Sequence, residues 1–113
     1  MTYRSVAQDF GNLLARKQYP AAWKLLTDEA QASITPEDIQ SAVTTMIAHA
    51  PGQIQEAQIM EDFILEDWPN KRPGDLAVVY VALTGVSFSE AVTLTLVQAG
   101  EDALIRQLEW GRP

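Results

Sequence analysis

The sequence predicts an α+β fold in which three N-terminal helices pack on a curved, four-stranded antiparallel sheet, in the order α-α-α-β-β-β-β. Up to about residue 50, apolar residues recur every three to four positions, which is the period of a helix. From residue 54 onward they alternate with polar residues instead, as in strands. Helical segments that precede all strands are typical of α+β domains. The 113 residues match one domain spanning residues 1–113.

Each of the three predicted helices has its own boundary signals. The apolar stripe of the first consists of Val6, Phe10, Leu13 and Leu14. Pro20 begins the second helix at a favoured first position. The stripe of the second consists of Ala22, Leu25, Leu26 and Ala30. Thr35 and Asp38 have the spacing of a capping box at the start of the third helix, which Pro51 and Gly52 end.

The four strands are expected over residues 54–66, 76–83, 88–98 and 103–110. The first alternates loosely, with an irregularity near Glu61 that indicates a bulge. Residues 68–75 contain two prolines and predict a loop. Residues 76–83 are apolar on both faces, as in a central strand covered on both sides. Short turns between successive strands predict a meander.

Composition excludes several classes of function. The chain has no cysteine, so it forms neither a disulfide nor a thiolate metal site. No spacing resembles a zinc or calcium site, and no cofactor-binding motif is present. The sequence therefore predicts neither a metal nor a cofactor.

The net charge of −7 is concentrated in the second half, where residues 54–113 carry ten acidic and four basic side chains. Such a surface repels nucleic acid and anionic membranes, so neither is an expected partner, whereas a basic protein is compatible. The N-terminal residues do not resemble a signal peptide, and no apolar run has the length of a membrane span. We expect a cytoplasmic protein.

Three segments carry a resemblance to a known family: residues 10–26, residues 34–39 and residues 92–110. They are similar to the opening helices, the start of the third helix and the closing hairpin of the nuclear-transport-factor-two-like superfamily. This α+β cone also occurs in ketosteroid isomerases and polyketide cyclases. The resemblance implies a cavity inside the cone, with an isomerase tyrosine on the first helix. Phe10 stands at that position and has no hydroxyl, and residues 32–35 lack the carboxylate of the base. The sequence therefore favours a binding module over an enzyme.

Two groups of residues are candidates for a binding site. The cavity lining is predicted to include Phe10, Met46, Tyr80 and Arg106. Arg106 shares the face of Leu104 and Leu108 in a regular strand. If that face lines the cavity, Arg106 would pair with Asp62 or bind an anion, whereas a bulge would turn it to solvent. The residues predicted to bind a protein partner are Glu61, Glu66, Trp68 and Glu109. Trp68 is either a partner anchor or a cap over the core.

The function predicted from these features is that of a non-enzymatic binding module of the bacterial cytoplasm, such as an immunity or adaptor protein that binds a basic partner. The alternative is a small-molecule binder, or an isomerase or cyclase, that uses the cone cavity. His49 is the single histidine and is assigned a structural role at the end of the third helix. A homodimer is also expected, through an apolar outer sheet face to which Val79 and Val81 are assigned, unless the first strand shields that face.

Overall fold

Four α-helices and four strands occur in residues 2–111, the part of the chain that the computed structural model describes. The helices are α1 (Tyr3–Ala15), α2 (Tyr19–Trp23), α3 (Asp28–Ser33) and α4 (Pro36–Ile47). The strands are β1 (Glu56–Ile59), β2 (Asp75–Thr84), β3 (Ser89–Ala99) and β4 (Asp102–Trp110), with a short 3-10 helix, η1 (Glu61–Phe63), between β1 and β2. The predicted α+β class with a four-stranded antiparallel sheet is confirmed, but the prediction of three helices is wrong.

The second predicted helix is divided into α2 and α3 by a contact with the sheet. The backbone N–H of Thr27 donates to the carbonyl of Ile105 (2.8 Å), and the N–H of Ile105 donates to the carbonyl of Leu25 (2.9 Å). The Thr27 hydroxyl then accepts from the N–H of Ala30 and caps α3. Residues 25–27 thus run alongside β4, and their backbone bonds replace those of a continuous helix.

The start of α4 agrees with its sequence pattern. The Thr35 hydroxyl accepts from the N–H of Asp38 (3.1 Å), and the Asp38 carboxylate accepts from the N–H of Thr35 (2.9 Å). Pro36 occupies the first turn, where its missing N–H leaves no helical bond unmade. The predicted capping box is therefore present.

The strands form an antiparallel sheet in the order β1-β2-β3-β4, so the predicted meander is confirmed. The single long strand expected over residues 54–66 is wrong. Its regular part is confined to β1, after which η1 turns the chain away and Leu65 returns to form an isolated bridge with Val78. At the other end of the sheet, Gly100 joins β3 to β4 with a φ of 62°, which favours glycine.

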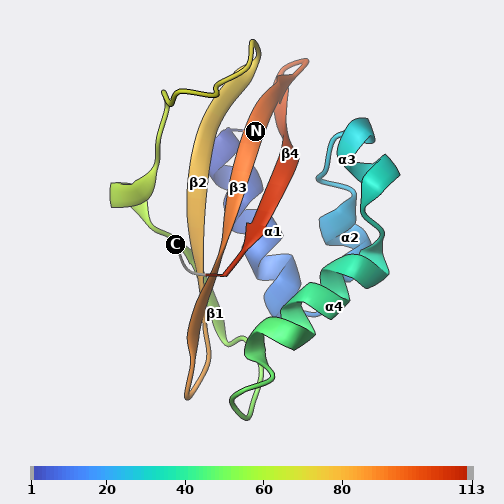
Figure 1. Ribbon diagram of the computed structural model, residues 1–113, viewed down its shortest axis with the longest axis vertical. Coiled ribbons are helices and arrows are strands. Elements are labelled where there is room, and N and C mark those ends of the chain that lie inside the picture. Colours follow the sequence, from blue (N-terminus) through green and yellow to red (C-terminus); the bar gives the residue numbers. More distant parts are fainter. Residues whose placement is uncertain (1, 112–113) are drawn as a thin grey trace.

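Helix α1 covers one face of the sheet, and helices α2 to α4 lie beside the sheet at its β4 edge (Figure 1). A Cβ atom at Gly11 of α1 would lie 2.8 Å from the Cβ of Ala57 and 2.9 Å from Val81, so glycine permits the close approach of this helix. Phe10 is fully buried on the same side, and its ring lies 6.5 Å from that of Trp110. None of the described helices is long and apolar enough to cross a membrane.

The face of β2 that packs against α1 carries Ala77, Val79, Val81 and Leu83, all fully buried. The assignment of Val79 and Val81 to the outer face is therefore wrong. The outer residues of β2 alternate with these and are half-buried: Leu76, Val78, Tyr80, Ala82 and Thr84. We call this side of the sheet, away from α1, the open face.

Candidate binding site on the open face of the sheet

Two rows of side chains cross the open face in register. The first row consists of Phe63, Tyr80, Thr93 and Glu109. The second row consists of Leu65, Val78, Thr95 and Gln107. Phe63 is 57% exposed and Leu65 is 50% exposed, so each row begins with an apolar side chain in solvent. Both rows run from an apolar end beside β2 to a polar end on β4.

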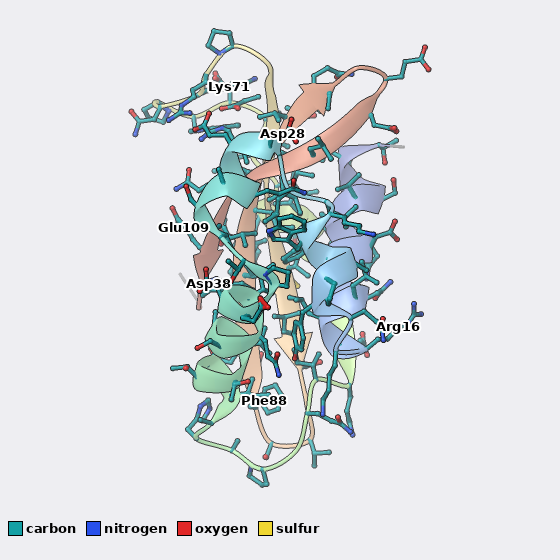
Figure 2. All side chains as sticks on the ribbon, turned by 90° about the vertical axis from the view of Figure 1, so that its right-hand side faces the viewer. Arg16, Asp28, Asp38, Lys71, Phe88 and Glu109 are labelled. Atoms are coloured by element: carbon teal, nitrogen blue, oxygen red, sulfur yellow. The ribbon has the colours of Figure 1, made fainter. Side chains whose placement is uncertain are left out.

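A pocket of about 220 Å³ lies at the polar end of these rows. Its lining consists of Trp68, Asn70, Val78, Thr93, Thr95, Arg106, Gln107 and Glu109. Trp68 reaches the pocket from the loop between η1 and β2, and the N–H of Lys71 donates to its carbonyl (3.2 Å). Figure 2 shows Lys71 in this loop at one end of the molecule, and Glu109 at the side opposite α1.

Arg106 enters the pocket because of an irregularity in the pairing of β3 with β4. Leu96 pairs with Ile105 and Thr95 pairs with Gln107, so Arg106 is an extra residue with no partner in the β3–β4 register. Its side chain reaches Asp75 at the start of β2, with Nε–Oδ1 and Nη2–Oδ2 distances of 2.7 and 2.8 Å. Since β3 lies between β4 and β2, this bidentate ion pair crosses β3 on the open face of the sheet.

The surroundings of this ion pair exclude water from the carboxylate. The Asp75 side chain is 0% exposed and that of Arg106 is 15% exposed. The N–H of Arg72 also donates to Asp75 Oδ2 (2.8 Å). Hydrogen bonding from Arg106 lowers the pKa of the Asp75 carboxyl, in spite of burial, which acts in the opposite direction. The same bonds raise the pKa of Arg106. Both groups therefore stay charged at neutral pH and neutralise each other.

Acid is expected to destabilise the fold through Asp75. Because its pKa is lower in the folded than in the unfolded state, its contribution to stability is complete above the unfolded value of about 3.9. That contribution is lost as the pH falls through the folded pKa. Urea unfolding between pH 2.5 and 7 should show a steeper loss below about pH 4 for the wild type than for Asp75→Asn. Identical slopes would contradict the role of this carboxylate.

The predicted cavity residues do not share one cavity. Phe10 and Met46 lie on the helix side of the sheet, whereas Tyr80 and Arg106 lie on the open face. Arg106 pairs with Asp75 and not with Asp62. On the helix side, a groove of about 510 Å³ separates α4 from the end of β4. The groove is lined by Asp38, Ser41, Ala42, Thr45, Met46, Trp110 and Gly111.

Two of the four predicted partner-binding residues, Trp68 and Glu109, line the pocket on the open face. The other two contact the N-terminal end of α1. Glu61 forms an ion pair with Arg4 (3.2 Å), and Glu66 accepts from the hydroxyl of Tyr3 (3.1 Å).

His49 lies away from the pocket, with its Nε2 atom 3.6 Å from a carboxylate oxygen of Glu90 and its side chain 58% exposed. Over residues 2–111, no cluster of three or more histidine or acidic side chains has the geometry to hold a metal ion.

Sequence reasoning missed Asp75, Thr93 and Thr95 as site residues. The sequence pattern places Asp75 in a loop, although an acidic residue at the start of one apolar strand and an arginine within another are a signal for a cross-sheet pair.

Comparison of the chain with models of known protein families, with curated proteins and with solved structures finds no match. The resemblance to the nuclear-transport-factor-two-like superfamily therefore stays a prediction.

Proposed function

We propose that the protein is a non-enzymatic binding module, of the adaptor or immunity type, that engages a basic protein partner through the open face of its sheet. The observation that carries this proposal is the exposure of Phe63 and Leu65 beside a pocket walled by Trp68 and Glu109. Exposed apolar side chains next to a polar rim are typical of protein interfaces, and tryptophan is enriched among their anchors.

The chemistry of the pocket suits binding better than catalysis. Its charged lining residues are Arg106, which is held by Asp75, and Glu109, which lies exposed on the rim. A general acid or base works best with a pKa near the working pH and an orienting partner. The arginine is held in its charged form and is committed to Asp75, so it does not have that character.

Charge favours a basic partner over a second copy of the chain. Glu109 lies at the β4 end of the open face, and Asp62 is an exposed residue of η1, next to Phe63. Two copies that met through this face would repel each other at long range, because each carries a net charge of −7. A basic surface would gain from the same charges and would associate faster at low salt.

Site-specific photo-crosslinking tests this proposal. A photoreactive amino acid at Leu65 should crosslink a basic protein in extracts of the producing cells, whereas the same group at Thr44 on the exposed side of α4 should not. The complex formed with the purified partner should weaken as salt is raised.

Crosslinking from both positions, or binding that is insensitive to salt, would contradict the proposal. A crosslinked species with twice the chain mass would instead support the homodimer.

The groove between α4 and β4 favours a second candidate function, the binding of a small molecule. Its volume of about 510 Å³ falls in the range of roughly 300–1,000 Å³ that is usual for such sites, and its lining combines the apolar Met46 and Trp110 with the polar residues Ser41 and Thr45. A thermal-shift screen should then identify a ligand whose saturation stabilises the protein by about 2.7 kcal/mol at one hundred times its dissociation constant. The variant Thr45→Trp, which fills the groove, should lose that shift. A shift that persists in the variant would exclude this groove as the site.

A further inference from the structure

We infer that the pocket beside Trp68 is a subsite for a single arginine side chain of the partner. This inference rests on the proposed function and adds the chemical identity of the anchor. It is carried by the charge balance of the pocket, by its hydrogen-bond acceptors, and by its aromatic wall and size.

The charge balance of the pocket favours a cation, although an arginine lies in its lining. Arg106 directs Nε and Nη2 to Asp75, and its Nη1 donates to Gln107 (3.3 Å). The ion pair has no net charge, so Glu109 supplies the uncompensated charge of the lining residues. The ammonium of Lys71, which is not a lining residue, lies over the Trp68 ring and donates to the carbonyl of Glu66. An incoming anion would meet this carboxylate, while Arg106 is already committed to Asp75. A guanidinium would instead be attracted to Glu109.

Hydrogen-bond acceptors surround the space that a guanidinium would occupy. The carboxylate of Glu109 accepts from Gln107 Nε2 (3.3 Å), which uses one of its roughly four lone-pair sites. Thr93, Thr95 and Asn70 also line the pocket, and each carries a side-chain oxygen that is able to accept a hydrogen bond. A guanidinium has five N–H donors in a planar fork and no acceptor, so it matches a site that presents several oxygens.

The aromatic wall already binds a cation of the chain itself. The Nζ atom of Lys71 lies 5.6 Å from the centre of the Trp68 ring, and it also donates to the carbonyl of Glu66 (2.6 Å). Tryptophan is the aromatic side chain that attracts cations most strongly, and guanidinium groups stack on its face. The pocket volume of about 220 Å³ is below that of usual small-molecule sites and suits one side chain.

NMR titration of the full chain with N-acetyl-arginine amide tests the subsite. The expected result is a saturable shift of the Trp68 indole N–H and of the Thr93 and Thr95 amide signals. The uncharged analogue N-acetyl-citrulline amide and the acidic N-acetyl-aspartate amide should leave these signals unchanged. Glu109→Gln should weaken the arginine effect at least fivefold, a difference of about 1 kcal/mol. The matched variant Glu101→Gln, in the β3–β4 turn, should leave it unchanged.

Three results would overturn the subsite. Equal shifts with the citrulline analogue would show that charge is not recognised, shifts with the aspartate analogue would identify an anion site, and the absence of shifts would show that no such side chain binds. Failure of the subsite is distinguishable from failure of the proposed function. Crosslinking from Leu65 persists when the subsite alone is wrong, and it disappears when the open face is not a binding surface.

Discussion

Replacement of Arg106 by methionine is expected to lower the free energy of unfolding by about 3–5 kcal/mol at pH 7, because it leaves the buried Asp75 carboxylate without its partner. Methionine retains much of the apolar stem that lies across β3, so the loss reports on the ion pair more than on packing. Since a domain of this size is stable by about 5–15 kcal/mol, the variant should stay folded at low temperature but unfold at a much lower urea concentration.

The double variant Asp75→Asn with Arg106→Met is the control. Removing both charges leaves no unpaired ion, and the asparagine amide oxygen is able to accept from the N–H of Arg72. We therefore expect the double variant to recover more than half of the stability that Arg106→Met loses. A single variant as stable as the wild type would show that the Asp75 carboxylate is solvated and that the ion pair is not buried.

The substitution Val81→Glu is expected to destabilise the protein by about 4 kcal/mol or more, since it places a carboxylate in the fully buried layer between β2 and α1. Its neighbour Ala82 points to the open face, where a glutamate reaches solvent, and Ala82→Glu should change stability by less than about 1 kcal/mol. Thermal unfolding followed by circular dichroism measures both effects.

This pair of variants also tests which side of the sheet faces outward. A Val81→Glu protein that folds normally and differs only in its association state would contradict the burial of this side chain. Ala82→Glu is the appropriate variant for association through the open face. Light scattering should give a mass near 12.5 kDa for it even if the wild type forms the predicted homodimer.

The sequence by itself determined those features whose causes lie within a few residues. The Thr35–Asp38 capping box joins residues three positions apart, so it was visible in the pattern. The antiparallel meander was predicted from short turns between strands, and it is present although the connection from β1 to β2 covers residues 60–74. Trp68 and Glu109 are predicted partner-binding residues, and that role stays a prediction. They line the same pocket, which nothing in the chain indicated.

Only the tertiary structure decided the features whose causes are distant in the chain. The break between α2 and α3 depends on Ile105, which lies almost 80 residues further on. The partner of Arg106 depends on an irregularity in the β3–β4 pairing and on the position of Asp75 across the sheet. The sequence did not determine which face of β2 is buried, because valines and alanines occur on both faces. Neither face is polar, so the alternation of side chains along the strand does not distinguish the buried face from the outer one. Packing against α1 determines which face of β2 is buried, and therefore which face of the sheet is open and carries the pocket.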